Sequence, residues 1–336
     1  MTKFIKDIFP GVFLALFVAL GAKFLERLLP LQYIGESVLA LFLGIFLNNF
    51  IKTDKFSKGL KFTSKKILKL AIIFLGASLN IAMVLHVGKL SLTVMVFTLL
   101  TCFGGGHFIG KALGLNWRMS SLISAGTGIC GGSAIAALAP VIDAEDVDVA
   151  YAMSATFIFD IAMIVLFPIM GRALNLSDIA YGLWTGTAVN DTSSVVAAGY
   201  AYSEAAGDFA TMVKLTRTLS IIPTVLVFSI ISQKKKSDRS KGQGVGVKIS
   251  SIFPYFILGF LALSLINSFG FISESLAHNL KTLSKFLMVM ALGSIGLNTS
   301  FKDLQKSGIN PMVHGFVISL LVVVVSLLVQ VFMGLV

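Results

Sequence analysis

Apolar runs of 18 or more residues recur along almost the whole of this 336-residue chain. A helical run of that length crosses the hydrocarbon core of a bilayer, which is roughly 30 Å thick. Only 13% of the residues are charged and the mean hydropathy is +0.91, whereas a soluble domain carries about 25% charge. A transmembrane β-barrel would instead show alternating segments of about ten residues. The sequence therefore predicts an all-α, polytopic membrane protein that forms a single domain over residues 1–336.

The distribution of basic residues predicts the orientation. Most of the 27 Lys and Arg residues fall on one side of the membrane if the N-terminus is cytoplasmic, as in a multi-pass protein of a bacterial plasma membrane. This distribution accounts for the net charge of +11, so we expect no nucleic-acid partner. Residues 52–66 and 233–248 are predicted to be lysine-rich cytoplasmic loops, with binding of anionic lipid headgroups as the alternative. Eleven spans are expected, at residues 9–28, 34–51, 67–86, 89–110, 118–141, 148–172, 178–199, 209–232, 250–269, 284–300 and 311–335.

One predicted span is interrupted by the glycine-rich stretch SAGTGICGGSAIAALAP, residues 124–140. A broken helix leaves backbone N–H and C=O groups unpaired, which is tolerated at membrane depth only inside protein or beside a watery cavity. The half-helix expected to begin near Ser133 would direct N–H groups towards an anion. Close helix packing is the alternative explanation for such glycines, and it is the one we favour for Gly106 and Gly110. The break itself is assigned to Gly126, Gly128, Gly131 and Gly132.

A second polar segment, GTAVNDTSSVVAAG at residues 186–199, lies within another predicted span. Five consecutive polar residues facing lipid would be costly, so we expect them to line a cavity, with an extramembrane loop as the alternative. The five residues are Asn190, Asp191, Thr192, Ser193 and Ser194.

Three ionisable residues also fall inside predicted spans. Asp160 lies in the middle of its span, and Lys214 and Arg217 are three residues apart, on one face of a helix. A charge at this depth is costly unless it is paired or hydrated, and the planar guanidinium of Arg217 suits an oxyanion. The alternatives are a structural Asp160–Arg217 pair and a Lys214 that extends to the membrane surface. Lys69 lies near the end of its predicted span and is assigned no role.

Two pairs of segments resemble each other within the chain. FLGASLN (74–80) and ALGSIGLN (291–298) each precede an apolar span, and the predicted spans run in opposite directions, as an inverted repeat requires. The polar segments 126–140 and 186–199 form the second pair. They are predicted to run in the same direction, unless one of them is re-entrant.

Over essentially its whole length, the chain resembles the YeiH-type sulfate exporter family of bacteria. The resemblance is strongest in GTGICGGSAIAALAPVI (126–142), WTGTAVNDTSSVVAAG (184–199) and VKLTRTLSIIP (213–223). The second motif departs from the family, in which many members have His in place of Asn190 and Gln in place of Ser194. The family is grouped with bile-acid-symporter-like and arsenite-exporter-like carriers. That grouping implies inverted repeats, two broken helices that cross near the midplane, and a core domain that moves against a panel domain.

These observations predict a secondary transporter that exports a small anion, such as sulfate or a related sulfur oxyanion or sulfonate. The alternatives are a sodium- or proton-coupled carrier of organic carboxylates and, less favoured, a membrane sensor without transport. We expect no enzymatic activity, no metal and no cofactor, and a homodimer is a candidate assembly. The coupling-ion candidates are Asp160 and Asp191. The predicted substrate-binding residues are Thr127, Gly128, Cys130, Gly131, Gly132, Ser133, Asn190, Thr192, Ser193, Ser194, Lys214 and Arg217.

Overall fold

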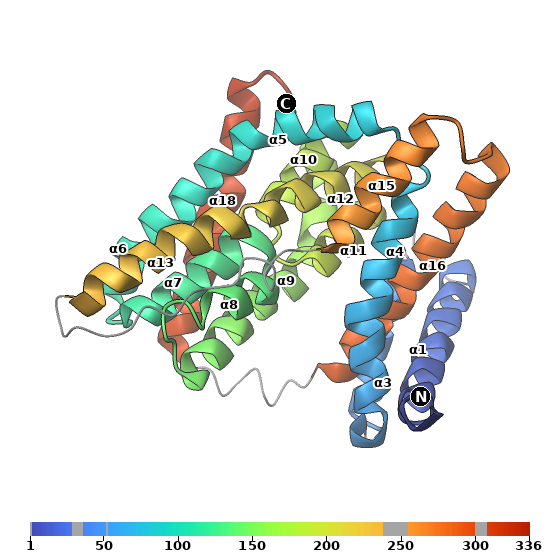
Figure 1. Cartoon of the computed structure of the whole chain (residues 1–336), viewed down its shortest axis with the longest axis horizontal. Helices are drawn as coiled ribbons and strands as arrows, with labels where there is room; N and C mark the ends of the chain where they lie inside the picture. Colours follow the sequence, from blue (N-terminus) through green and yellow to red (C-terminus); the bar gives the residue numbers. More distant parts are fainter. Residues whose placement is uncertain (1, 29–35, 52, 238–254, 300–307) are drawn as a thin grey trace.

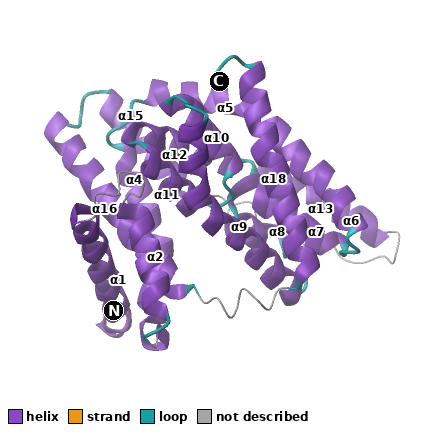
Figure 2. Cartoon of the chain, turned by 180° about the vertical axis from the view of Figure 1, so that it is seen from behind, coloured by secondary structure: helices purple, strands orange, loops and turns teal. Residues whose placement is uncertain are grey.

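A computed structural model describes residues 2–28, 36–51, 53–237, 255–299 and 308–336. The described residues form helices joined by short turns and contain no strand. Six of the described helices are long and apolar enough to cross a membrane. The predicted all-α, polytopic membrane fold is confirmed. The helices form two bundles that stand side by side (Figures 1 and 2).

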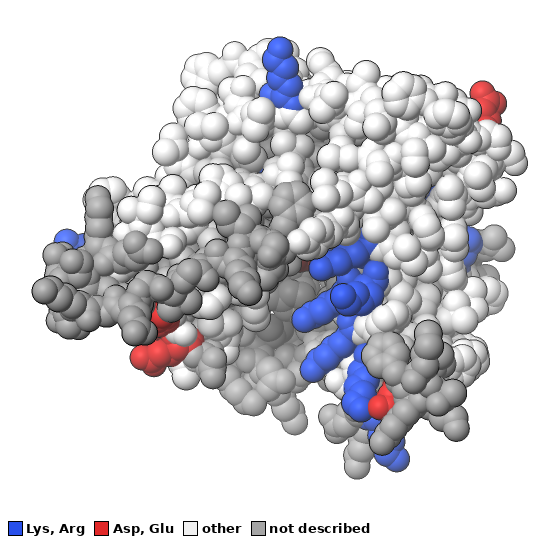
Figure 3. Space-filling model, in the orientation of Figure 1, with Lys and Arg blue, Asp and Glu red and all other residues white. Residues whose placement is uncertain are grey.

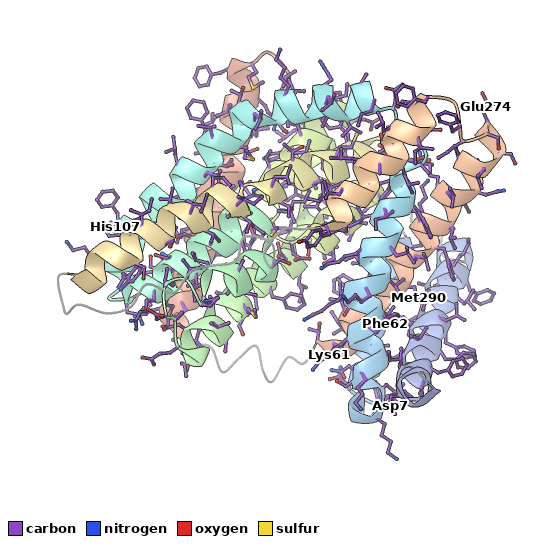
Figure 4. The ribbon with its side chains drawn as sticks, viewed as in Figure 1. Asp7, Lys61, Phe62, His107, Glu274 and Met290 are labelled. Carbon is purple, nitrogen blue, oxygen red and sulfur yellow. The ribbon has the colours of Figure 1, made fainter. Side chains whose placement is uncertain are left out.

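The smaller bundle, which we call the side bundle, contains α1 (Thr2–Leu28), α2 (Glu36–Asn48), α15 (Tyr255–Ser268), α16 (Glu274–Asn298) and one composite helix. The composite helix runs through η1 (Thr53–Phe56), α3 (Ser57–Phe62), the π-helical turn η2 (Thr63–Ile67) and α4 (Leu68–Gly76). An ion pair of 2.7 Å between Asp7 and Lys58 joins the starts of α1 and α3. Figure 4 shows Asp7 and Lys61 at one end of this bundle and Glu274 at the other. We call the end near Asp7 the N-terminal side.

The larger bundle, which we call the hairpin bundle, is built on four long helical stretches. These are α5 (Ile81–Leu100) with η3 (Thr101–Gly105) and α6 (Gly106–Ala112); α9 (Asp146–Ala173); α12 (Glu204–Leu219) with α13 (Ile221–Ser237); and α18 (Ile309–Phe332). The closely spaced glycines of α6 serve packing, as predicted. A Cβ atom on Gly106 or Gly110 would lie 2.2 or 2.3 Å from the hydroxyl of Ser124 or Ser120 in the neighbouring α7 (Trp117–Ala125).

The first broken segment is a re-entrant hairpin over residues 117–138, hereafter hairpin 1. It consists of α7, the π-helical turn η4 (Gly126–Cys130), a reversal at Gly131 and the short α8 (Gly132–Leu138). Asn116, the N-cap of α7, donates to Asp148 at the start of α9 over 3.0 Å. The end of α8 is followed within a few residues by that same start of α9. Both ends of the hairpin therefore lie at the start of α9, at the same end of the molecule as the N-terminus (Figure 1).

The second broken segment is a re-entrant hairpin over residues 178–202, hereafter hairpin 2, formed by α10 (Asp178–Ala188) and α11 (Thr192–Tyr202). The first turn of α10 contacts the last turn of α11. Tyr181 donates to the carbonyl of Ala198 over 2.9 Å, and its ring stacks on Tyr202 with 3.9 Å between centroids. Because α9 crosses the bundle between the two hairpins, hairpin 2 enters from the side opposite hairpin 1.

The hairpins settle a point that the sequence leaves open, namely whether the polar segments cross the membrane or re-enter it. Both are re-entrant, and they come from opposite sides. The sequence predicted that Arg172, at the end of the sixth span, lies on the same side as the N-terminus. It lies instead on the opposite side, where it donates to the carbonyl of Ala201 at the base of hairpin 2. The segments 74–80 and 291–298 are followed by α5 with α6 and by α18. Asn310, at the start of α18, donates to the carbonyl of Leu113, at the end of α6, over 3.1 Å, so these two spans run in opposite directions, as predicted.

The structure also corrects the third and fourth predicted spans. The helix predicted over 67–86 ends at Gly76, and the next begins at Ile81, because the Asn80 side chain caps it by accepting from the N–H of Ala82 over 2.8 Å. Residues 53–66, predicted as part of a loop, are helical and lead directly into α4. In the other predicted loop, residues 233–237 end α13, while residues 238–248 lie outside the described residues.

Candidate functional site

The tips of the two hairpins meet inside the hairpin bundle. Gly131, at the tip of hairpin 1, has φ +64° and ψ −133°, a backbone conformation that is open almost only to glycine. A Cβ atom at this position would lie 3.1 Å from the Cβ and the Oδ1 of Asp191, at the tip of hairpin 2. Glycine therefore permits both the reversal of the chain and the contact between the tips.

Two buried cations from α12 join the tips. Lys214 Nζ donates to the carbonyl of Ile129 over 2.8 Å and to that of Val189 over 2.9 Å, so one ammonium group bridges both hairpins. Arg217 donates through Nε to the carbonyl of Gly128 over 2.7 Å, through Nη1 to Val189 over 3.2 Å, and through Nη2 to Thr127. These carbonyls end η4 and α10, where intrahelical partners are missing and the helix dipole is negative. The two cations supply the missing hydrogen-bond donors, and their positive charge offsets the negative end of each helix dipole.

Two carboxylates accept hydrogen bonds from the backbone N–H groups at the tip of hairpin 2, which have no partner within a helix. Asp160, buried on α9, accepts through Oδ1 from the N–H of Asn190 over 2.9 Å and through Oδ2 from the N–H of Asp191 over 3.1 Å. Asp191 is the N-cap of α11 and accepts from the N–H of Ser193 over 2.9 Å and from the Ser193 hydroxyl. A carboxylate at the N-terminus of a helix is stabilised by the helix dipole. When both carboxylates are ionised, they balance the two cations of α12.

Ser319, in the middle of α18, lies beside both tips. Its hydroxyl is 3.5 Å from that of Thr127 and accepts from the Asn190 amide over 3.3 Å. The Oδ1 atom of Asn190 is buried and has no hydrogen-bond partner among the described residues. Three helices of the bundle, α9, α12 and α18, thus each place a polar group where the hairpins meet.

A cavity of about 690 Å³ lies between the hairpin tips and the side bundle. The hairpin bundle contributes seven of the predicted site residues to its wall, namely Asp160, Cys130, Gly132, Ser133, Asp191, Thr192 and Ser193. The side bundle contributes Ser64, Lys65, Leu68, Lys69, Ile72, Phe256 and Ile295. Figure 3 shows blue side chains gathered along the flank of the side bundle that faces the hollow between the bundles. The cavity therefore has carboxylates on one wall and ammonium groups on the other.

The remaining predicted residues lie behind this wall. Thr127, Gly128, Asn190, Lys214 and Arg217 form the tip contacts described above without lining the cavity, and Gly131 makes the reversal. Ser194 is buried in α11, away from the cavity lining. The donors of Lys214 and Arg217 are engaged by carbonyl oxygens, so in this conformation they hold the walls of the cavity rather than face its interior.

Sequence reasoning missed Lys65, Lys69 and Ser319. The two lysines were placed in a loop and at a span end because the span containing them was expected to begin at residue 67. The helix in fact begins ahead of them, at residue 53, which places both within a continuous helical stretch that lines the cavity. Ser319 belongs to a row of buried polar residues along α18, with His314, Ser326 and Gln330, and that row within an otherwise apolar span was the available signal.

The cavity lies in the half of the protein nearer the N-terminal side, and the other half is closed. An apolar cluster that includes Leu75 and Phe260 of the side bundle and Val196 and Phe209 of the hairpin bundle fills the seam there. Beyond it, ion pairs join α16 to the start of α12. Lys281 Nζ lies 2.6 Å from Asp208 and 2.8 Å from Glu204, and Lys285 Nζ lies 2.7 Å from Glu204. These contacts separate the cavity from the opposite side.

Comparison with known proteins finds one matching family over most of the chain. The family described as conserved hypothetical protein 698 matches residues 10–315. A UPF0324 membrane protein of Clostridium tetani is 57% identical over 341 residues, covering 98% of this chain and 99% of that protein. UPF0324 membrane proteins of Streptococcus pyogenes serotype M18 and Streptococcus mutans serotype c are 42% and 41% identical, each covering at least 96% of both chains.

Proposed function

The chain belongs to the family of conserved hypothetical protein 698, whose relatives are membrane proteins, and we propose that it is a secondary transporter of small anions. In this proposal the anion is sulfate or a related sulfur oxyanion or sulfonate, and it is exported across the bacterial plasma membrane by alternating access. The N-terminus would then be cytoplasmic, which places the cavity in contact with the cytoplasm.

The observation that carries the proposal is the pair of hairpins that enter from opposite sides and meet at a cavity. Irregular backbone inside a membrane protein is expensive, and it occurs in transporters where it surrounds a binding site near the midplane. A volume of about 690 Å³ falls within the range of roughly 300–1,000 Å³ that is typical of small-molecule sites. Walls supplied by two bundles give the geometry needed for alternating access, because movement of one bundle against the other would change the side to which the cavity opens.

The membrane potential can drive such export. Moving one elementary charge through 100 mV changes the free energy by about 2.3 kcal/mol. For a divalent anion that leaves a negatively charged cytoplasm, the potential therefore makes export more favourable by roughly 4.6 kcal/mol. Within the cavity the anion would meet Asp160 and Asp191, and a proton or cation bound there would remove their repulsion. We therefore propose these two carboxylates as the coupling group. Lys214 and Arg217 would act by fixing the tips on which the site is built.

A second candidate is a sodium- or proton-coupled carrier of organic carboxylates. It is favoured by the carboxylates in the cavity wall and by the Asn190 Oδ1 atom beside them, which accepts no hydrogen bond from the described part of the protein. Carboxylate, amide and hydroxyl oxygens suit a hard cation. Uptake of a carboxylate against the membrane potential, driven by an imposed sodium or pH gradient, would favour this candidate over potential-driven export.

The test is anion flux in liposomes that contain the purified protein. Sulfate, alkyl sulfonates and carboxylates would be loaded inside and their release followed with and without an imposed potential. We expect release of at least one anion to depend on the protein and to be lost with Asp191→Asn, whereas Glu145→Gln, at an exposed position, should match the wild type. Release no faster than from protein-free liposomes for every anion would refute transport, and binding without flux would point to a sensor.

A further inference from the structure

Lys65 and Lys69 occupy the wall of the cavity that faces the hairpins. They lie four residues apart along η2 and α4, so they point the same way, and both line the cavity. Neither forms an ion pair with an acidic side chain in the part of the chain that the structure describes. The Lys69 ammonium lies 5.5 Å from the ring centroid of Phe256, a cation–π distance that holds it at the cavity surface.

Both lysine side chains are exposed, and both line the cavity. Lys69 follows Ser57, the first residue of α3, by a helical path of roughly 18 Å, so it lies well along the helix from the N-terminal side. An ionisable side chain inside a membrane protein usually serves a ligand or an ion path. Lys61, one turn nearer the N-terminal side, lies on the flank of α3 that faces the hairpin bundle (Figure 4). The lysines thus lead from the N-terminal side to the cavity.

The surface next to the lysines is apolar. On the side bundle it is formed by Leu68, Ile72, Phe256 and Ile295, and Met153 and Phe157 continue it on α9. An inorganic oxyanion is strongly hydrated and needs polar donors around its whole surface to replace water. This cavity offers cations on one flank and hydrocarbon beside them, which suits a molecule with one anionic end and an apolar body.

We propose that the substrate is an organic anion, a carboxylate or a sulfonate with an apolar body, whose anionic group is bound by Lys65 and Lys69. The proposal rests on the anion transport proposed above and assigns its substrate class, which includes organic carboxylates and disfavours inorganic sulfate. The apolar part contacts Ile72, Phe256 and Ile295, and inorganic sulfate binds more weakly than the organic anions. Because the lysines belong to the side bundle and the carboxylates to the hairpin bundle, the bound substrate spans both.

The test measures binding to the purified full-length protein by calorimetry, with n-alkyl sulfonates and n-alkyl carboxylates of two to six carbons and with inorganic sulfate at matched ionic strength. We expect the Kd to fall about fourfold for each added methylene group that is buried. Lys65→Gln and Lys69→Gln should each weaken binding by about tenfold or more, as for loss of a charged hydrogen bond. Lys66→Gln, at an exposed position outside the cavity lining, should bind like the wild type.

The outcomes separate this inference from the proposed function. Sulfate that binds as tightly as the hexyl anions, or a Kd independent of chain length, would overturn it while leaving anion transport intact. Equal effects of Lys65→Gln, Lys69→Gln and Lys66→Gln would also overturn it. Absence of both binding and flux for every anion would remove the transport function itself. The chain-length series uses the wild-type protein, so it decides the matter even if a lysine variant folds poorly.

Discussion

Replacing Lys214 with methionine tests whether one buried cation holds the two hairpins together. Methionine retains much of the length of the side chain but removes both donors, so the carbonyls of Ile129 and Val189 lose their partner. The variant also leaves the two carboxylates at the tips balanced by Arg217 alone. Removing one partner from a buried charge network costs about 3–5 kcal/mol, and each charged hydrogen bond contributes roughly 1.5–3 kcal/mol.

The expected cost corresponds to a clear change in thermal stability. At roughly 2–4 °C per kcal/mol, Lys214→Met should lower the apparent Tm in detergent by about 6 °C or more. Lys66→Met, on the exposed surface of the side bundle, is the matched control and should change the Tm little. Adding Asp160→Asn to Lys214→Met should cost less than the sum of the two single changes, because charge balance is restored. A Tm of Lys214→Met within 2 °C of the wild type would refute the bridging role.

Three further variants test other parts of the account. Gly131→Ala places a Cβ atom against Asp191 in a left-handed backbone and should destabilise more than Gly114→Ala, where φ is +69° but no atom lies within 4 Å; melting temperatures decide. Asp208→Asn should lower the Tm by more than Glu204→Gln, because the Asp208 side chain is 12% exposed and the Glu204 side chain 58%. In 1 M salt the effect of Glu204→Gln should vanish and that of Asp208→Asn should remain. Asp191→Asn should keep the N-cap of α11 at a partly buried position, lowering the Tm by less than Lys214→Met, while flux in liposomes is lost. Equal Tm changes for Gly131→Ala and Gly114→Ala would contradict the tip contact, and equal changes for Asp208→Asn and Glu204→Gln would contradict the role of burial. Full flux in Asp191→Asn would contradict its role in transport.

The sequence predicted the helix breaks because their causes are local. Four glycines within residues 126–132 cannot sustain a helix in hydrocarbon, and five polar residues from Asn190 to Ser194 cannot face lipid. The partners of the breaks lie far along the chain and could not be predicted from spacing. Lys214 and Arg217 were expected to face a substrate, yet their donors meet carbonyl groups more than 20 residues away.

The sequence did not reveal that the two hairpins are re-entrant or that Lys65 and Lys69 line the cavity, and the physical reason is different. A hairpin of 22 to 25 residues has the same length and hydropathy as a single span, so nothing in residues 117–138 or 178–202 separates the two. The turn at residues 77–80 is only four residues long and has two polar residues, Ser78 and Asn80, between apolar flanks, so the end of α4 was not apparent. The expected span therefore began too late, and Lys65 and Lys69 were placed outside the membrane or at its edge.

The most direct test of the paired hairpins is the sidedness of their flanking residues. Single cysteines would be introduced at Lys111, Glu145, Ala173 and Ala205, which are exposed, in a chain whose native Cys102 and Cys130 are replaced by alanine. A membrane-impermeant thiol reagent would then be applied to each face of oriented vesicles. We predict that Lys111→Cys and Glu145→Cys react from one face and Ala173→Cys and Ala205→Cys from the other. Reaction of Lys111→Cys and Glu145→Cys from opposite faces would show that residues 117–138 cross the membrane, and would contradict the account.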